Sequence, residues 1–405
     1  MELEIRPIVP EEFDDFGRAD ASAFGFPYNP EHMEDTKKVL ELDRTLASFD
    51  GPEIVSTTAI FSFEMTVPGG TLPTAGVTWV SVKPTHRRRG ALRGMMSRQL
   101  SDIRDKGEPI AALWASESVI YGRFGYGLAA HDANLEIDRL RTELAVVPQT
   151  PGRLRIVERE QALREWPAVY DRVRPTRPGM YSRSETWWAH ETLRAREFGR
   201  SSAAKFMVQY EEQGEVLGYA RYSIKGDESL GLPSGNLRVG ELMAATDAAY
   251  GALWQYLFGV DLIATIEAPL RQVDEPLYWM LADPRRLVRR PLDSLWVRIV
   301  DVAGALEGRR YAAPGRLVFD VQDDFCPWVA GRYRLESGEN GARCRPTDDE
   351  PDITLRAADL GAIYLGGTRL RALRRAGRVS GDDEALARAD AMFAWDPLPW
   401  CPEVF

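Results

Sequence analysis

Short apolar runs alternate with amphipathic stretches along the first 150 residues, which is the pattern of an α/β fold. The run at 75–82 is rich in β-branched residues and is bounded by Pro73 and Pro84, as a strand would be. Apolar residues recur at helical spacing over 92–103, so a helix should follow that strand. Strands are predicted at residues 3–8, 44–49, 53–67, 75–82 and 110–115.

The alternation of strands and helices resumes after a linker at residues 147–151, and a third unit begins with the apolar run 295–302. The expected domains are therefore 1–148, 149–292 and 293–405. Further strands are predicted at 154–157, 204–210, 215–224, 237–243, 316–321, 333–335 and 353–355. Further helices are predicted at 161–173, 185–196, 247–258, 357–364, 369–376 and 383–393.

The last eleven residues, from Trp395 to Phe405, contain two tryptophans, three prolines and a terminal phenylalanine. Most chains end in polar, mobile residues. We therefore expect this tail to be buried, and a buried α-carboxylate needs a partner or a function. The alternative is that Phe405 is only a hydrophobic anchor.

Composition narrows the class of protein. The net charge of −10 argues against general nucleic-acid affinity and fits a cationic substrate better. The three cysteines, Cys326, Cys344 and Cys401, are widely spaced and form no Cys-x-x-Cys, so neither a disulfide framework nor a metal site is expected. The N-terminus has no apolar secretion core and no run reaches membrane-spanning length, so a cytoplasmic protein is expected.

Candidate chemistry lies first at the junction between the strand at 75–82 and the helix that follows it. Arg87, Arg88 and Arg89 precede Gly90, and Arg93 follows within the first helical turn. A helix N-terminus offers backbone N–H groups, and cationic side chains beside it favour an anion such as a pyrophosphate. Glycine, which lacks a Cβ, lets the backbone approach that ligand closely. The alternative is a basic helix start on the surface.

Residues 88–93, Arg-Arg-Gly-Ala-Leu-Arg, resemble the acetyl-CoA motif of the GNAT acyltransferases, R/Q-x-x-G-x-G/A. Ala91 replaces a glycine of that pattern and Arg93 its small last residue. The longer string Val82–Arg93 resembles one branch more closely, the enhanced intracellular survival (Eis) N-acetyltransferases of actinobacteria. This resemblance implies two tandem GNAT-like domains, the second degenerate, followed by a sterol-carrier-protein-like α+β domain.

The resemblance also implies acetyl-CoA as cosubstrate, with no metal. Backbone groups of Val80 and Val82 would bind the pantetheine arm as an added strand would, and an N–H there would polarise the thioester carbonyl. The carried-over cofactor-binding residues are Val80, Ser81, Val82, Arg88, Arg89, Gly90, Ala91, Leu92, Arg93, Ser116 and Glu117.

A second string, from Ser116 to Gly127, resembles the Y-x-x-x-G-F/Y element of the family. A short helix there would place Tyr121 facing the strand ends, where a tyrosine can protonate the departing thiolate. The pKa values of a thiol and a phenol, about 8.5 and 10, are close enough for that transfer. We assign the general-acid role to Tyr121; the alternative is that Tyr121 and Tyr126 are both packing aromatics.

The resemblance gives the terminal carboxylate of Phe405 the role of general base, since an ammonium must lose a proton before it attacks. His86 is a second candidate, although its place in the motif turn favours a structural or phosphate contact. The loop from Phe24 to Pro30 either overhangs the acceptor cleft or simply packs. Acidic residues such as Asp20 could attract a polycation.

The two later units carry weaker signals. The second strand–helix junction, 243–247, has no arginine or glycine and places Asp247 where a pyrophosphate would lie, so this unit should not bind CoA. In the third unit a basic strip is interpreted as a solvated or interface face rather than a lipid or nucleic-acid site. The strip consists of Arg371, Arg374, Arg375 and Arg378.

The resulting prediction is an acetyl-CoA-dependent N-acetyltransferase that acts directly on a primary amine, either an aminoglycoside-like polyamine or a lysine side chain. The resemblance further implies a homohexamer built as a dimer of trimers. The alternative is a non-catalytic CoA- or lipid-binding scaffold protein. A lipid carrier would need a deep apolar pocket between Leu295 and Phe393.

Overall fold

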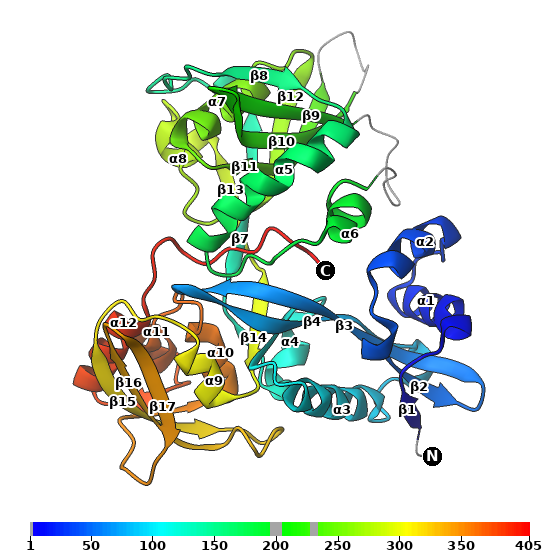
Figure 1. Ribbon diagram of the computed structural model, residues 1–405, viewed down its shortest axis with the longest axis vertical. Coiled ribbons are helices and arrows are strands. Elements are labelled where there is room, and N and C mark those ends of the chain that lie inside the picture. The colour runs from blue at the N-terminus through cyan, green and yellow to red at the C-terminus, as the bar shows by residue number, and fades with distance from the viewer. Residues whose placement is uncertain (1–2, 195–204, 227–233) are drawn as a thin grey trace. The chain divides into compact units, whose positions relative to one another are not determined.

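The computed structural model describes residues 3–194, 205–226 and 234–405, which form three mixed sheets with helices packed on them (Figure 1). These residues divide into two compact units. The first contains residues 1–130, 293–399 and 403–405, and the second contains 131–292 and 400–402. In the described part of the chain, no helix is both long and apolar enough to cross a bilayer.

The first sheet has the strand order β1-β2-β3-β4-β5-β14-β6. The long hairpin β3–β4 follows β2 through a turn at Gly51 and Pro52. Beyond this hairpin, β4 and β5 run parallel and pair only over Thr74–Gly76. The strands are β1 (Glu4–Arg6), β2 (Leu46–Asp50), β3 (Glu53–Val67), β4 (Gly70–Val82), β5 (Ile110–Trp114), β6 (Gly127–Leu128) and β14 (Leu295–Ile299).

Helices α1 (Phe13–Phe24) and α2 (Pro30–Val39) lead from β1 to β2, and α1 packs on β3 and β4. Helix α1 ends at Gly25, whose φ of 75° is the left-handed conformation typical of a helix C-terminus. Helix α2 begins after Asn29, whose side chain accepts hydrogen bonds from the first-turn N–H groups. The predicted loop between these helices is confirmed. Helices α3 (Ala91–Asp105) and α4 (Ser118–Tyr121) complete this region.

Strand β4 is longer than the sequence predicted. It begins at Gly70, with Pro73 inside it and opposite Glu64 of β3. The pairing with β5 begins only at Thr74, so at Pro73 the strand has a single partner. Proline is tolerated in a strand where one edge is free. The prediction used Pro73 as the boundary of the strand, and for this reason it placed the beginning of the strand too late.

Two strands join sheets other than those that the expected boundaries assign to them. The run from Leu295 was placed at the start of the third unit, but β14 pairs with β5 and β6 in the first sheet. Strand β7 (His131–Asp138) lies before the expected boundary at 148 but pairs with β12 in the second sheet. An apolar pattern indicates that a strand is buried. It does not indicate which strand lies beside it in the sheet.

The second sheet has the order β13-β7-β12-β11-β10-β9-β8. Trp166 of α5 stacks on Tyr219 of β10 with ring centroids 4.2 Å apart, at the centre of one of its cores. The helix predicted at 247–258 is confirmed as α7 (Asp247–Phe258). The other elements are β8 (Arg153–Ile156), α5 (Arg159–Val173), α6 (Glu185–Trp187), β9 (Lys205–Glu212), β10 (Glu215–Lys225), β11 (Gly235–Ala244), β12 (Ile263–Gln272), α8 (Leu277–Met280) and β13 (Val288–Asp293).

The helix predicted at 185–196 is shorter than expected: α6 gives way to a π-helical turn over Trp188–Thr192. Residues 195 and 196 of that prediction, and the first residue of the strand predicted at 204–210, lie outside the described residues.

The third sheet has the order β17-β16-β15-β18-β19 and belongs to the first unit. Helix α10 joins it to the first sheet, because Gly127 of β6 and Gly361 of α10 allow close contact. A Cβ on Gly127 would lie 1.8 Å from the carbonyl oxygen of Ala358. The elements are α9 (Val302–Glu307), β15 (Gly315–Gln322), β16 (Gly331–Gly338), β17 (Gly341–Pro346), β18 (Ile353–Arg356), α10 (Ala357–Ile363), α11 (Leu370–Arg375), β19 (Ser380–Gly381) and α12 (Asp383–Phe393).

The predicted basic strip is largely neutralised within its own domain. Arg371 pairs with Asp390 at 2.8 Å, Arg378 pairs with Asp359 at 2.6 Å, and Arg374 pairs with Asp383. Carboxylates already compensate these three arginines, so the strip offers less charge to an anionic partner than its sequence suggests.

The predicted burial of the tail is confirmed for Trp400, Cys401 and Glu403. Trp400 belongs to the second unit, where its indole N–H donates to the carbonyl oxygen of Leu270 at 2.8 Å. Phe405 belongs to the first unit, where its ring meets that of Phe63 edge to face with centroids 5.2 Å apart.

Candidate active site

The strand–turn–helix junction folds as a helix start that is open to a ligand. Gly90 precedes α3 with a φ of 91°, and no side chain caps the helix there. The N–H groups of Ala91, Leu92 and Arg93 have no acceptor within the helix because of their position in its first turn. A Cβ on Gly90 would meet no atom within 4 Å. The glycine is therefore required by its left-handed backbone, while the space above it stays open for an anion.

The corresponding junction of the second unit has a capped helix start and carries a negative charge. The Thr246 hydroxyl accepts a hydrogen bond from the N–H of Ala249 at 3.2 Å, which caps α7 from within the chain. Asp247 starts that helix and places negative charge where an anion would approach.

Strand β4 separates from β5 beyond Gly76, and this leaves backbone groups of β4 without a strand partner. The register between β3 and β4 shifts by one residue around Trp79, whose φ is 53°, so β4 bulges there. The N–H of Lys83 donates to Val55 of β3 at 2.9 Å. Because N–H direction alternates along a strand, the N–H of Val82 points away from β3, into the gap between β4 and β5.

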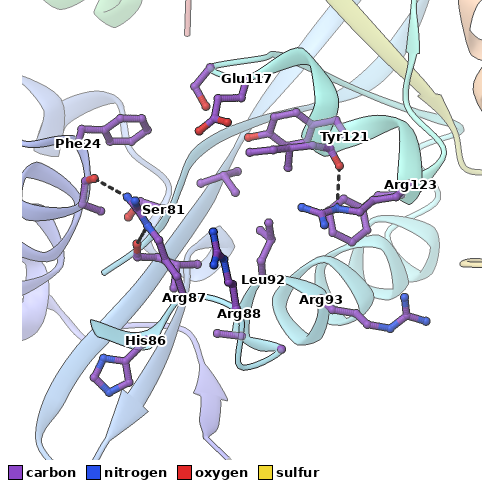
Figure 2. Close-up of a pocket in the computed structure, with 18 residues that line it drawn as sticks. Phe24, Ser81, His86, Arg87, Arg88, Leu92, Arg93, Glu117, Tyr121 and Arg123 are labelled. Atoms are coloured by element: carbon purple, nitrogen blue, oxygen red, sulfur yellow. Dashed lines mark hydrogen bonds between the residues drawn. The ribbon is translucent and has the colours of Figure 1, made fainter. Parts of the chain in front are cut away.

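A cavity of about 740 Å³ opens over this gap and the start of α3. Arg87 and Arg88 line one side of it, and Glu117, Tyr121 and Arg123 lie on the other side (Figure 2). Arg87 is held in place by hydrogen bonds to the carbonyl oxygens of Val82, at 3.2 Å, and Ala23, at 2.9 Å. The cavity therefore combines open helical N–H groups with fixed positive charge.

The structure brings nearly all of the predicted cofactor-binding residues to this one cavity. Arg89 is the exception, because its exposed side chain does not line the cavity. Arg93 lines it, but its side chain runs away from the centre and its guanidinium lies over the ring of Phe325, 5.1 Å from the centroid (Figure 2). The predicted residues that line the cavity are Val80, Ser81, Val82, Arg88, Gly90, Ala91, Leu92, Arg93, Ser116 and Glu117.

The predicted cofactor-binding residues omit two cations that line this cavity, Arg123 and Arg87, although Arg87 was noted in the basic cluster before Gly90. Arg87 lies in the motif string, but the family pattern starts one residue later. Arg123 lies between Tyr121 and Gly125 in a 3₁₀ turn over Gly122–Phe124, and it donates to the carbonyl oxygen of Ile120 at 3.0 Å. Its only sequence signal was its proximity to Tyr121.

Tyr121 is buried at the end of α4 and lines the cavity with its neighbour Glu117. Burial raises the pKa of its phenol, a hydrogen bond with Ser116 opposes this rise, and the charge of Glu117 adds to it. A phenol with a raised pKa stays protonated at neutral pH and can donate its proton. Tyr126 is fully buried, burial also raises its pKa, and it lines neither this cavity nor the next.

A second cavity of about 270 Å³ shares Phe24, Val80, Ser116 and Tyr121 with the first. Its wall also contains Phe405, the last residue of the chain. Gly76 makes room for this, since a Cβ there would lie 2.5 Å from the ring of Phe63 and 3.3 Å from that of Phe405. The structure thus brings Phe405 and Tyr121 to one cavity, although nearly three hundred residues separate them in the sequence.

Asp20 of α1 also lines this second cavity, and its side chain is buried. Ser81 donates a hydrogen bond to the carboxylate, and the Oγ1 atom of Thr57 lies 3.5 Å from Oδ1. Burial raises the pKa of Asp20 to about 6, because it disfavours the charged form more than the two hydroxyls stabilise it.

His86, the alternative base, is engaged on both ring nitrogens. Its Nε2 lies 3.1 Å from Asp50 and its Nδ1 lies 2.8 Å from the hydroxyl of Thr85. Its ring points away from the centre of the first cavity in Figure 2. These contacts favour the structural interpretation of His86.

Comparisons with known proteins agree with this architecture. Models of the acetyltransferase (GNAT) domain match residues 4–129 and 179–299, and a model of the sterol carrier protein domain matches residues 302–402. An uncharacterized N-acetyltransferase of Streptomyces avermitilis is 43% identical over 378 residues, which cover 93% of this chain and 92% of the relative.

Two mycobacterial proteins extend the similarity. The N-acetyltransferase Eis of Mycobacterium tuberculosis is 36% identical over 360 residues, which cover 85% of this chain and 84% of the relative. The crystal structure of Eis1 from Mycobacterium abscessus is similar with a TM-score of 0.85 at 32% identity, and the match covers 99% of this chain and 100% of that one.

Proposed function

The chain belongs to the Eis family of GNAT N-acetyltransferases, and we propose that it transfers an acetyl group directly from acetyl-CoA to a primary amine. It is an acetyltransferase with two GNAT domains and a C-terminal sterol carrier protein domain. The acceptor classes that we propose are aminoglycoside-like polyamines and lysine side chains.

The observation that carries this proposal is the position of Tyr121 at the meeting point of two cavities of opposite character. The larger cavity offers arginines and open helical N–H groups, which suit the phosphates of a CoA thioester. The smaller one contains Asp20 and the terminal residue Phe405, which suit an ammonium. An acyl donor and an amine in these two cavities would meet beside one phenol.

In this proposal the larger cavity binds the donor. The N–H groups of Ala91, Leu92 and Arg93 and the guanidinium of Arg88 would hold the pyrophosphate. The open edge of β4 at Val80 and Val82 would hydrogen-bond the pantetheine arm, and an N–H of this edge would polarise the thioester carbonyl.

The transfer needs one base and one acid. The α-carboxylate of Phe405 would accept a proton from the acceptor ammonium, and the free amine would then attack the thioester carbonyl. As the tetrahedral intermediate collapses, the C–S bond breaks and Tyr121 would give its phenolic proton to the leaving thiolate, while the nitrogen gives up its second proton and restores the phenol. The proton held by the carboxylate of Phe405 then leaves to solvent. The products are an N-acetyl amine and CoA thiol, and no covalent enzyme intermediate is required.

Two measurements on the full chain test the proposal. Calorimetric titration with acetyl-CoA should give saturable binding, and release of CoA thiol, followed with a chromogenic disulfide, should depend on added amine. Binding without amine-dependent thiol release, for kanamycin, a lysine peptide and simple alkyl and arylalkyl amines, would reject acetyl transfer in favour of the scaffold alternative. Neither cavity described above includes a residue from 295–393, where a lipid carrier would need its pocket.

A further inference from the structure

The loop between β15 and β16, residues 323–330, contacts helix α3, whose first turn forms the open helix start described above. The guanidinium of Arg93, in that first turn, lies over the ring of Phe325, 5.1 Å from its centroid. In the last turn of the helix, the guanidinium of Arg104 lies over the ring of Trp328, also 5.1 Å from its centroid. The loop belongs to the sterol carrier protein domain. This domain therefore contacts α3 at both of its ends.

Phe325 also contacts the segment that carries Tyr121. Its ring meets that of Phe124 edge to face with centroids 4.9 Å apart, and Phe124 belongs to the 3₁₀ turn that directly follows Tyr121. Arg93 and Phe124 both line the first cavity, whereas Phe325 lines neither of the two cavities. Phe325 therefore packs behind the cavity wall, where its ring joins the start of α3 to the turn after the proposed acid.

A buried ion pair holds this loop in place. Arg298 of β14 pairs with Asp323, and their side chains are 0% and 2% exposed. The Oδ1 atom of Asp323 accepts hydrogen bonds from the N–H groups of Phe325 and Cys326, each at 2.9 Å. Hydrogen bonds to an ionised carboxylate are stronger than those between neutral groups. They fix the backbone that carries the ring of Phe325.

The same arginine lies against the end of the Tyr121 turn. Gly125 ends that turn with a φ of 83°, and a Cβ on it would lie 1.9 Å from Nη1 of Arg298. The Nε and Nη1 atoms of Arg298 have no hydrogen-bond partner among the described residues. Buried ion pairs often add little to stability, because the cost of desolvation offsets their attraction. Stability alone therefore explains this pair poorly, whereas a role in holding the loop and the turn together accounts for its location.

We propose that this loop is a positioning element of acetyl transfer, in which Phe325 holds Arg93 and the Tyr121 turn in one arrangement. Phe325 is a positioning residue, because it acts through these two neighbours. The inference rests on the proposed roles of the α3 start and of Tyr121. It gives the sterol carrier protein domain a part in the reaction that is separate from the terminal residue Phe405.

Replacing the ring of Phe325 in the full chain tests the inference. Phe325→Leu keeps an apolar side chain but removes the contacts with Arg93 and Phe124. The Kd for acetyl-CoA, measured by calorimetry, should rise about 3-fold. The kcat of thiol release, measured with whichever amine named above is released fastest as its N-acetyl product, should fall about 10-fold, because a small displacement of a reacting group is costly. Phe325→Tyr keeps the ring and should hold both values within about twofold of the wild type.

Trp328→Leu is the matched control. It removes the same kind of contact from the same loop, but its partner Arg104 lines neither cavity. It should leave Kd and kcat within about twofold, and urea midpoints report the loss of stability in each variant. Phe325→Met, whose flexible side chain fills similar space without a ring, should behave as Phe325→Leu does. Unchanged Kd and kcat in both ring-free variants of Phe325, or equal losses in Trp328→Leu, would overturn the inference.

Double-mutant cycles separate positioning from a general loss of stability. In a Tyr121→Phe background the phenolic proton is absent, so Phe325→Leu should lower kcat by less than about twofold more. In an Arg93→Gln background, Phe325→Leu should likewise change the Kd for acetyl-CoA less than about twofold. Fully additive losses in both cycles would show that Phe325 acts through neither neighbour and would overturn the inference.

The outcomes also separate this inference from the function on which it rests. Normal acetyl-CoA affinity and normal turnover in Phe325→Leu would overturn the inference and leave acetyl transfer standing. Absence of thiol release from every amine would reject acetyl transfer. The Kd values for acetyl-CoA would then still decide whether Phe325 positions Arg93.

Discussion

The rings of Tyr121 and Tyr126 meet edge to face with centroids 6.0 Å apart, yet only Tyr121 lines the two cavities. Five residues apart in the sequence, both tyrosines are buried and both have a raised pKa. The two tyrosines differ in their access to the cavities. This difference matters because a proton donor must reach the reacting atom.

Removing the hydroxyl of Tyr121 should stop proton donation without disturbing the packing of its ring. We expect Tyr121→Phe to lower kcat about 100-fold or more, with the Kd for acetyl-CoA unchanged within about twofold. Tyr126→Phe is the matched control and should keep kcat within about twofold. Steady-state thiol release and calorimetry measure both quantities, and equal losses in the two variants would contradict the assignment.

Displacing the terminal carboxylate tests its role as the base. One extra glycine after Phe405 moves the α-carboxylate by up to about 3.8 Å, which is beyond hydrogen-bond reach of its original position. Turnover should fall strongly while acetyl-CoA affinity is kept. Val404→Ala, at an exposed neighbour, keeps the natural terminus and should be near normal. Unchanged turnover in the extended chain would move the base to another group.

The two adjacent arginines of the motif should differ in donor binding. Arg88 lines the first cavity and Arg89 does not. We expect Arg88→Gln to weaken acetyl-CoA about 10-fold, which corresponds to loss of one charge-assisted hydrogen bond of about 1.5 kcal/mol. Arg89→Gln should change the Kd less than threefold. Titrations at two salt concentrations measure both effects, and a larger effect at Arg89 would contradict the described geometry.

Replacing Gly90 by alanine should lower both the stability of the protein and its affinity for acetyl-CoA. Its φ of 91° is strained for any residue with a Cβ, so Gly90→Ala should destabilise the fold by about 1 kcal/mol and weaken acetyl-CoA. Gly122 is the control: a Cβ there also meets no atom within 4 Å, but its φ of −57° suits alanine. Urea midpoints and acetyl-CoA titrations should separate the two variants, and identical behaviour would show that the backbone conformation does not matter.

Asp20 should make the protein less stable at neutral pH than an asparagine would. Burial raises its pKa from about 3.9 to about 6, so the folded state binds this proton more tightly than the unfolded state does. Stability therefore falls as pH rises through this window, by roughly 3 kcal/mol above pH 6.

Asn cannot ionise, so the advantage of Asp20→Asn should be largest near pH 7.5 and roughly half as large near pH 5. The groups that contact Asp20 are the hydroxyls of Thr57 and Ser81, and Tyr121 and Phe405 line the same cavity. Urea midpoints at the two pH values measure the difference. An advantage that is the same at both would show that Asp20 titrates normally.

Sequence by itself determined the bounds of several elements and the donor motif. The predictions of a strand at 53–67 and of helices at 247–258 and 383–393 match β3, α7 and α12 residue for residue. These features depend on local rules: side-chain period, N-capping residues and a glycine before a helix. The motif residues also lie close together in the sequence, so their meeting at one cavity followed from a strand, a turn and a helix in succession.

Only the tertiary structure decided which distant parts meet. No local pattern shows that β14 completes the first sheet, or that Phe405 returns to Tyr121. Asp20 is the sharpest case, because in the sequence it is one of several acidic residues along a helix that carries charge elsewhere on its surface. Its burial, its raised pKa and the aromatic rings around it arise from packing against β3, β4 and the chain terminus. Such effects depend on long-range contacts, and their energies are set by the surroundings rather than by the neighbours in the chain.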